Sequence, residues 1–375
     1  MKFSNQLVLL FTALLLINCS KKEDVCHIHG TVVDTDTKTI LLARLNQDIV
    51  HDSVIEIPVI NGKFDYKLHV EKPEAYELAL KESVKSGMFR FSTVFIENTD
   101  INITIHPDED FDKNTVEGGK LNSEFFHYKK DKDKKFKTRS EAINSLPEKA
   151  NTPELERDVL DSIGKYYKDE QKWKQQYINK NNTLVSYYLL INSIIFDKEN
   201  IDILEVKKSF EKLSKQFPNH PYNELALNLI NAMSIEAGKK FIDFTAPDLN
   251  GNPITLSSQI EGKVALLDLW ATWCGPCITK SRTMVPIYND YKDKGFTVVG
   301  VAREKDNTKR LTEFLEKEKW PWQQLVDLDG ENKIWQKYGI PNGGGKIFLI
   351  DKTGTVLAVN PTAEEVRQHL EKTLN

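Results

Sequence analysis

Two of the four cysteines stand three positions apart, in the segment Cys274-Gly275-Pro276-Cys277. At the start of a helix, this spacing places both sulfurs on one face, where a disulfide can close with little movement. A helix N-terminus favours negative charge because its N–H groups lack partners, so it stabilises the thiolate of Cys274. Pro276 fixes a helical φ angle, and Gly275 lets another backbone approach the sulfurs. The segment therefore predicts a redox-active disulfide whose first cysteine is a nucleophile near neutral pH.

Other uses of the cysteines require ligands that the sequence does not supply. A zinc site needs a second pair of thiol or imidazole groups at metal spacing, and none accompanies this dithiol. A c-type haem would need histidine directly after Cys277, where Ile278 stands. The other cluster of soft ligands is Cys26-His27-Ile28-His29, which alternates like a strand. We interpret Cys26 as a spare thiol rather than a metal ligand, and we expect neither a metal nor a cofactor.

The elements around the dithiol alternate between strands and helices from Phe241 onward. Val264–Trp270 is an apolar run, broken by Asp268, that leads directly into the cysteine segment. Thr362 and Glu365 form a capping box for the last helix. Strands buried on both faces and joined by helices indicate an α/β fold. The pattern predicts further strands at Phe296–Val301, Ile347–Ile350 and Thr355–Val359. It predicts helices near Pro276–Lys292 and Thr308–Lys317.

The stretch from Leu266 to Cys277, LLDLWATWCGPC, resembles the active-site strand and turn of the thioredoxin superfamily. With Phe241–Asp248 and Gly262-Lys263 upstream, it is most similar to the TlpA-like branch of membrane-tethered thiol-disulfide oxidoreductases, over about residues 238–375. The resemblance implies a thioredoxin-like fold in which Cys274 attacks the disulfide of a partner and Cys277 resolves the mixed disulfide.

The same resemblance assigns roles to residues beside the cysteines. Asp268 matches a carboxylate that many thioredoxins bury behind the second cysteine. Burial would raise the pKa of this group and let it exchange a proton with Cys277. The alternative for Asp268 is a strand-end residue bonded to the backbone. Trp273 packs beside the sulfur in the family, whereas we expect Trp270 to be a core residue.

The predicted substrate-docking loop departs from the family pattern. Family members place a cis-proline about three residues before a Phe-Leu-Ile-Asp strand, and here Gly345 stands at that spacing before Phe348–Asp351. Either Pro341 takes the role through a four-residue extension, or the backbone of Gly345 replaces the proline. A second departure is Pro286, nine residues after Cys277, which suggests an extra helical turn before the kink.

The N-terminus has the features of an export signal. Lys2 precedes an apolar run of 11 residues, Leu7–Ile17, that is too short to span a membrane. Leu16-Ile17-Asn18-Cys19 resembles the bacterial lipobox, although Asn18 departs from the usual small residue. We therefore expect a signal peptide over residues 1–18, lipidation at Cys19 and a tether over 19–24, with a soluble exported protein as the alternative. A lipid anchor would hold the protein on a membrane, most simply facing the periplasm.

Residues 25–110 alternate with period two between turn residues, which predicts an antiparallel β-sandwich. Asn61-Gly62 suits a type I′ turn, so Val59–Phe64 is the clearest hairpin. The region is similar to the β domain that precedes thioredoxin modules in some bacterial lipoproteins. The predicted strands are Ile28–Val33, Thr39–Leu45, Val54–Ile60, Phe64–Val70, Tyr76–Leu80, Phe89–Ile96 and Ile101–Ile105.

Residues 111–237 lose this alternation and show helix signals. Thr152 and Pro153 suit the start of a helix with Leu155, Val159, Ile163 and Tyr167 on one face, and Pro218–Pro221 separates two later helices. Lys129–Arg139 holds seven basic and two acidic residues. We interpret this run as a solvated helix or loop rather than a lipid or nucleic-acid site.

The composition of the whole chain agrees with an exported multidomain protein. Its 375 residues are 40% apolar and 28% charged, with a net charge of -4, and allow two or three domains. This balance does not favour polyanion binding. The sequence thus predicts an envelope thiol-disulfide oxidoreductase that reduces protein disulfides and is recharged by a membrane electron donor. The alternatives are a binding or scaffold lipoprotein with a redox-sensing dithiol and a peroxiredoxin-like peroxidase. The context Thr272-Trp273-Cys274 lacks the Pro and Thr framework of peroxidases.

Overall fold

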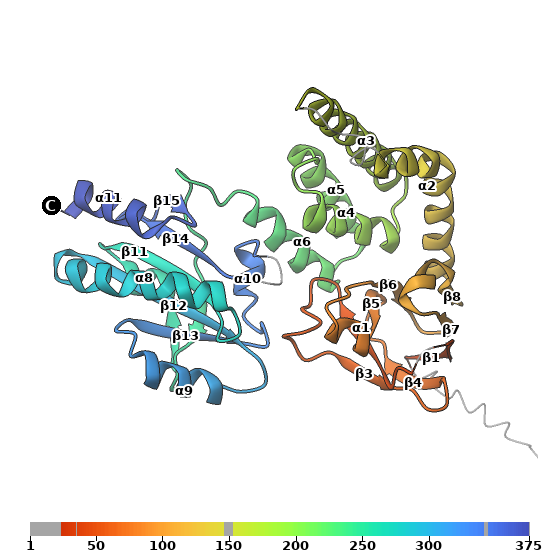
Figure 1. Cartoon of the computed structure of the whole chain (residues 1–375), viewed down its shortest axis with the longest axis horizontal. Helices are drawn as coiled ribbons and strands as arrows, with labels where there is room; N and C mark the ends of the chain where they lie inside the picture. The colour runs from red at the N-terminus through yellow and green to blue at the C-terminus, as the bar shows by residue number, and fades with distance from the viewer. Residues whose placement is uncertain (1–23, 35, 146–152, 341–343, 375) are drawn as a thin grey trace, which may run out of the picture.

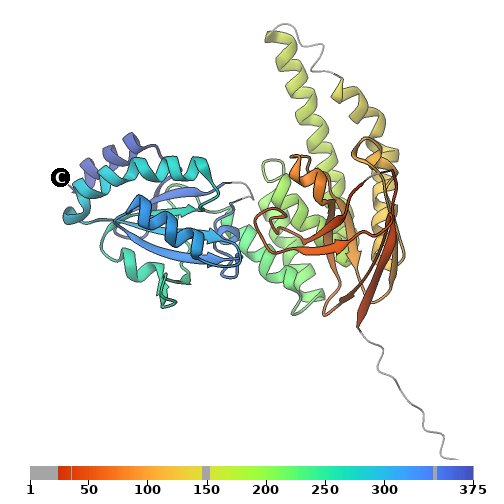
Figure 2. The same ribbon diagram turned by 60° about the horizontal axis from the view of Figure 1, so that its bottom comes forward.

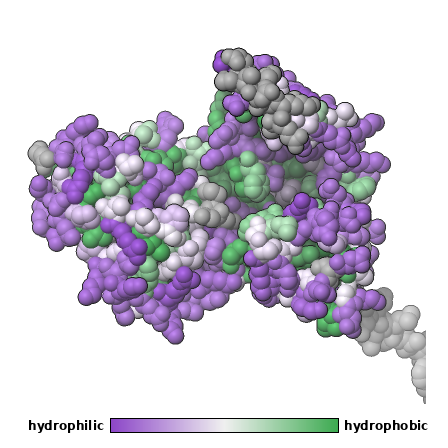
Figure 3. Space-filling model, viewed as in Figure 1, coloured by the Kyte–Doolittle hydropathy of each residue, from purple (hydrophilic) through white to green (hydrophobic). Residues whose placement is uncertain are grey.

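The computed structural model describes residues 24–34, 36–145, 153–340 and 344–374. Two β-sheets form the N-terminal part, helices follow, and an α/β unit ends the chain (Figure 1). Hydrophilic residues cover most of the face seen in Figure 3. No helix within the described ranges is long and apolar enough to cross a membrane. The predicted signal peptide, Cys19 and Pro341 lie outside the described residues.

The N-terminal sheets pack face to face around one apolar core. One sheet has the strand order β4-β1-β7-β8, and the other β3-β2-β5-β6. Inward residues such as Ile28, Ile40, Val94 and Ile101 are fully buried between them. The strands are β1 Val25–Val32, β2 Thr39–Arg44, β3 Ile55–Pro58, β4 Lys63–His69, β5 Glu74–Leu80, β6 Ser92–Ile96, β7 Asp100–Ile105 and β8 Thr115–Glu117.

The sandwich contains a parallel strand pair, β1 with β7, so the purely antiparallel arrangement predicted for it is wrong at this pair. The chain returns beside β1 twice, first as the antiparallel strand β4 and then, after β5 and β6 of the second sheet, as β7. Because β7 is not joined to β1 by a hairpin, its direction is free to be parallel. Asn61 and Gly62 have φ angles of 51° and 71°, which confirms the predicted hairpin turn. The short helix α1 (Lys81–Lys85) and strand β8 were not predicted.

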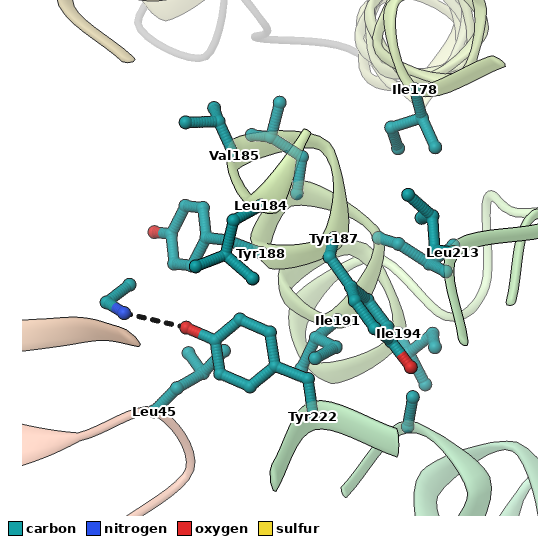
Figure 4. Packing of buried hydrophobic residues seen from close by; sticks show 14 of the residues in the cluster. Leu45, Ile178, Leu184, Val185, Tyr187, Tyr188, Ile191, Ile194, Leu213 and Tyr222 are labelled. Atoms are coloured by element: carbon teal, nitrogen blue, oxygen red, sulfur yellow. Dashed lines mark hydrogen bonds between the residues drawn. The ribbon is translucent and has the colours of Figure 1, made fainter. Parts of the chain in front are cut away.

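Helices α2 (Lys120–Asn144), α3 (Pro153–Lys180), α4 (Leu184–Phe196), α5 (Ile203–Gln216) and α6 (Pro221–Ala232) form the middle of the chain. Helix α4 is apolar on nearly every face and lies at the centre of their core (Figure 4). The basic run Lys129–Arg139 lies on α2, with most of its side chains exposed, as predicted.

Two buried side chains tie these helices to the N-terminal sheets. The hydroxyl of Tyr222 accepts the N–H of Ala75 at 2.7 Å (Figure 4). Asn122 pairs through its amide with both the N–H and the carbonyl of Phe95, at 2.8 Å each. Satisfied buried hydrogen bonds of this kind fix the direction in which an element packs. The sheets and helices therefore form one continuous structure.

The C-terminal unit is a five-stranded sheet of order β13-β12-β11-β14-β15, flanked by helices on both faces (Figure 2). Alternate residues of β11 face two separate cores, with Leu266 and Trp270 toward α8 and α11, and Leu267 and Leu269 toward α7 and α10. Its elements are β9 Thr245–Pro247, β10 Pro253–Thr255, α7 Leu256–Ile260, β11 Val264–Trp270, α8 Gly275–Tyr291, β12 Phe296–Glu304, α9 Lys309–Glu318, β13 Gln323–Leu328, α10 Ile334–Lys337, β14 Lys346–Ile350, β15 Val356–Val359 and α11 Ala363–Leu374.

Candidate active site

Strand β11 and helix α8 bring the two cysteines to the edge of the C-terminal sheet. Every residue of β11 is buried, so the strand is fixed in the centre of the sheet up to Trp270. The chain then turns, and Cys274 is the N-cap residue of α8, with Pro276 in the first turn. This is the helix start that the Cys-Gly-Pro-Cys spacing predicts. Pro286 lies inside the same helix, which continues for another turn beyond it.

The two cysteines form a disulfide, with their Cα atoms 5.3 Å apart. The Sγ atom of Cys274 accepts the backbone N–H of Cys277 at 3.3 Å, in the way that a capping oxygen accepts an N–H. Cys274 is only 4% exposed. A thiolate at this position would receive the same N–H and the positive end of the helix dipole.

Asp268 lies on β11, is 2% exposed, and is linked through Ser281 to the backbone of Cys277. Desolvation by burial raises the pKa of its carboxyl to about 7, although a hydrogen bond from Ser281 and the nearby charge of Lys280 oppose the rise. Ser281 Oγ lies 2.6 Å from the carboxylate and 3.0 Å from the carbonyl oxygen of Cys277. When Asp268 is protonated, it can donate to Ser281 while Ser281 donates to that carbonyl. The carboxyl can therefore hold or release a proton near neutral pH.

Gly345, directly before strand β14, contacts the second cysteine. Its N–H donates to the Sγ atom of Cys277 at 3.1 Å. A Cβ atom at this position would lie 1.8 Å from the carbonyl oxygen of Leu269, so any side chain would collide with β11. The glycine thus permits a close approach of backbone to sulfur. Pro341, the other residue predicted for the docking loop, lies outside the described residues.

The two tryptophans before the cysteines occupy different environments. Trp270 is fully buried, as expected of a core residue, and its Nε1 donates to Gln324 at 3.0 Å. Trp273 is partly exposed beside Cys274 and lies 5.6 Å from the ring of Trp335. A histidine of the N-terminal sheets, His51, stacks on Trp273 with ring centroids 3.7 Å apart and an interplanar angle of 9°.

The turn that presents Cys274 is held by a buried glutamate at the end of β12. Glu304 accepts both the N–H and the hydroxyl of Thr272 at 2.7 Å each. Desolvation raises the pKa of Glu304 despite these two hydrogen bonds. Arg310 donates to the carbonyl of Thr272 from the other side, at 3.3 Å. Sequence reasoning missed both Glu304 and Ser281, because their contacts depend on tertiary packing. A charged residue at the end of an apolar strand is the signal that points to Glu304.

Within the described parts of the chain, no group of three or more His, Cys, Asp or Glu residues could hold a metal ion. Cys26 is a free thiol on β1, fully buried, and its burial raises its pKa to about 11. His27, which follows it, points the other way and contacts Asp65 at 2.9 Å.

A sheet of this topology, with a Cys-x-x-Cys disulfide at the start of the helix that follows its central strand, defines a thioredoxin-like thiol-disulfide oxidoreductase. Comparison with protein-family models agrees with this class. Residues 237–359 match the AhpC/TSA family, and residues 26–125 match a domain of unknown function, DUF4369.

Individual relatives narrow the class further. The thiol-disulfide oxidoreductase ResA of Bacillus thuringiensis subsp. konkukian is 30% identical over 144 residues, which cover 37% of this chain and 79% of the relative. The thiol:disulfide interchange protein DsbE of Pseudomonas fluorescens biotype C is 30% identical over 138 residues, covering 36% and 72%. The chain belongs to the TlpA-like family of thiol-disulfide oxidoreductases that includes ResA and DsbE. A crystal structure of the thioredoxin domain of a Bacteroides vulgatus thiol-disulfide oxidoreductase is 28% identical, covering 38% of this chain and 100% of that one, with a TM-score of 0.34.

Proposed function

We propose that this protein reduces disulfides in exported proteins through Cys274 and Cys277. The observation that carries the proposal is the N-cap position of Cys274, whose sulfur receives the N–H of Cys277. This arrangement favours the thiolate, which is the attacking form of the residue. The Gly-Pro pair between the cysteines is similar to that of reducing thioredoxins, whose reduction potential is about -270 mV.

The reaction begins with the reduced dithiol. The thiolate of Cys274 attacks one sulfur of the client disulfide, and the other client sulfur leaves as a thiolate and takes up a proton. Cys277 then loses its proton and attacks Sγ of Cys274, which releases the second client thiol and closes the disulfide seen in the structure. The client gains two electrons from the dithiol and two protons, which equal the one that Cys274 released on ionising and the one that Cys277 gives up.

Asp268 is the group that we assign to the second step. Its burial behind the dithiol and its pKa of about 7 let it accept the proton of Cys277 as that thiol becomes a nucleophile. Ser281 is a positioning residue, since it fixes the carboxylate and contacts the carbonyl of Cys277 at the same time. Gly345 supplies a backbone N–H to the sulfur of Cys277, and we assign its main chain to the docking position that a proline takes in related proteins.

The proposed setting is the cell envelope. The sequence supports a signal peptide over residues 1–18 and a lipid anchor on Cys19. The clients are then disulfide-containing envelope proteins, and the electrons come from a membrane donor, because an envelope has no glutathione pool.

Reduction of a disulfide-linked peptide and of insulin, with dithiothreitol as electron source, tests the activity. Wild type should turn over the substrates, Cys274→Ser should lose turnover, and Cys26→Ser should behave as wild type because that thiol is buried on β1. A scaffold protein with a sensing dithiol would show no turnover even in the wild type.

The two-cysteine mechanism is tested separately with the variant that lacks Cys277. Cys277→Ala cannot resolve the mixed disulfide, so client proteins should accumulate covalently on Cys274 and run as adducts on non-reducing gels. The expected result is adducts that are cleaved by a reducing agent. Absence of adducts in a folded Cys277→Ala protein whose Cys274 still reacts with iodoacetamide would show that the assigned mechanism is wrong.

A further inference from the structure

A loop of the N-terminal sheets contacts Trp273, the residue next to the dithiol, from outside the thioredoxin-like unit. It connects β2 with β3, and in Figure 1 it is the orange segment beside β3 that extends toward the C-terminal sheet. We call residues 48–53 the β2–β3 loop. Asp52 in this loop forms an ion pair with Arg303 on β12, at 2.5 Å, and Ser53 Oγ lies 3.0 Å from the carboxylate of Asp306.

The β2–β3 loop is held in one conformation by its own hydrogen bonds. Asp48 accepts the N–H groups of Val50 and His51, at 2.9 and 3.1 Å, and its other oxygen lies 3.2 Å from the His51 ring. Asp52 accepts the N–H of Asp48 at 2.8 Å. Asx-type bonds of this kind fix a turn locally. The loop therefore has hydrogen bonds of its own that support its shape, in addition to its contacts with the other domain.

The contact between the domains is closed to solvent. The side chains of Asp52 and Arg303 are only 6% and 8% exposed. A buried ion pair is costly to separate because each charge would be left without its partner in a poorly solvated site. The guanidinium of Arg303 also lies 5.1 Å from the ring of Trp335, which contacts Trp273. The ion pair and the rings thus form one continuous contact next to the cysteine segment.

His51 is the part of this loop that lies closest to the chemistry. Its ring lies flat on Trp273, the residue directly before Cys274. His51 therefore stands over the neighbour of the attacking cysteine, on the surface next to which a client disulfide has to bind. A folded client needs a broad free surface around its target sulfur, whereas an extended chain needs only a narrow strip.

We propose that the β2–β3 loop is one wall of the client-binding site and that His51 determines specificity by favouring disulfides in extended chains over those in folded proteins. This inference rests on the proposed function. It gives the N-terminal sheets a role in selecting the substrate of a reaction that takes place on another domain.

The test compares kcat/KM for two substrates with the full-length protein. One substrate is a short unstructured peptide linked to a second copy by a single disulfide, and the other is native insulin. The ratio of the insulin value to the peptide value measures selectivity. His51→Ala should raise this ratio about five-fold or more, and His51→Phe, which keeps a flat ring on Trp273, should restore it to the wild-type value.

Two further variants make the result specific. Asp52→Asn removes the charge opposite Arg303 and should raise the ratio in the same direction as His51→Ala, with thermal melts to show that the variant is folded. His69→Ala changes an exposed histidine on β4 of the same domain and should leave the ratio unchanged. An unchanged ratio in the folded His51→Ala protein would overturn the proposal, as would a fall in it. If wild type reduces neither substrate, the proposed function itself fails.

Discussion

The Asp268→Asn substitution should change how the stability of the oxidised protein depends on pH. Burial raises the pKa of this carboxyl from 3.8 to about 7 in the folded protein. In the unfolded chain the carboxyl ionises at its ordinary value. Between these two pH values the folded protein holds a proton that the unfolded chain has released, so the contribution of Asp268 to stability falls as the pH rises from about 4 to 7. Asparagine stays neutral and shows no such loss.

The size of the effect follows from the shift in pKa. One pKa unit corresponds to about 1.4 kcal/mol, so a rise of about three units corresponds to about 4 kcal/mol. Because Ser281 can donate to an amide oxygen as it does to the carboxylate, its hydrogen bond is kept in the variant. The free energy of unfolding of Asp268→Asn should therefore gain about 4 kcal/mol relative to wild type between pH 4 and pH 8.

Urea unfolding of both proteins in the disulfide form, at several pH values, measures this difference. Asp293→Asn is the matched control, because Asp293 is exposed at the end of the same helical region. It reports what removal of an exposed carboxylate does to stability at each pH. The reasoning is refuted if the difference in unfolding free energy between Asp268→Asn and wild type stays constant within about 1 kcal/mol, since the carboxyl of Asp268 would then titrate as it does in the unfolded chain.

The kinetic counterpart separates the two steps of the reaction. Asp268→Asn should slow the resolution of the mixed disulfide more than the attack of Cys274 on a client, because the proposed proton acceptor serves Cys277. Rapid mixing with a chromogenic disulfide measures the rate of attack by Cys274. The decay of the mixed disulfide in the protein that keeps Cys277 measures the rate of resolution. Equal slowing of both steps would remove the proton-exchange role from Asp268.

Three further predictions concern single residues. Gly345→Ala should lower the free energy of unfolding in urea by about 1–3 kcal/mol. Gly344→Ala should have no effect, because its Cβ would meet nothing within 4 Å, and equal effects of the two substitutions would contradict the close approach of Gly345 to β11. Thr272→Val should cost about 1–3 kcal/mol, because it removes one of the two hydrogen bonds to buried Glu304, and an unchanged unfolding curve would contradict this role. Iodoacetamide at pH 8 should label Cys26 far more slowly in the native protein than in urea, since its pKa is about 11, and fast native labelling would contradict its burial.

The elements next to the dithiol could be predicted because their signals are local. The run Val264–Trp270 is apolar throughout except at Asp268, and it forms β11 with the predicted bounds. The capping box of Thr362 and Glu365 is present, with reciprocal hydrogen bonds of 2.7 and 3.2 Å. Both features depend on residues a few positions apart, so the sequence holds all the information that they require.

Strand β13 (Gln323–Leu328) was missed because its pattern is not that of a buried strand. Gln324 and Asp327 are both buried within it, yet each is polar. Gln324 accepts the indole N–H of Trp270, and Asp327 accepts the N–H groups of Asn332 and Ile334. Tertiary hydrogen bonds thus replace the apolar side chains that a periodicity argument requires.

The N-terminal part of the site was beyond prediction for a different reason. Hydrophobic periodicity reports that a residue is buried, but not which residue covers it. His51 and Trp273 are more than 200 positions apart in the chain, and nothing near His51 identifies an aromatic partner. The sequence of the β2–β3 loop carries no signal for a partner outside its own sheets.

The end of β12 shows how the two halves of the site are linked. Arg303 and Glu304 are the last residues of this strand, and neighbouring residues of a strand point to opposite faces of a sheet. Glu304 holds the turn before Cys274, and Arg303 holds Asp52 of the β2–β3 loop. Two buried charges at the end of an apolar strand are weak contributors to stability by themselves. Their placement indicates a positional role, because one strand end holds both the cysteine turn and the loop whose His51 stacks on Trp273.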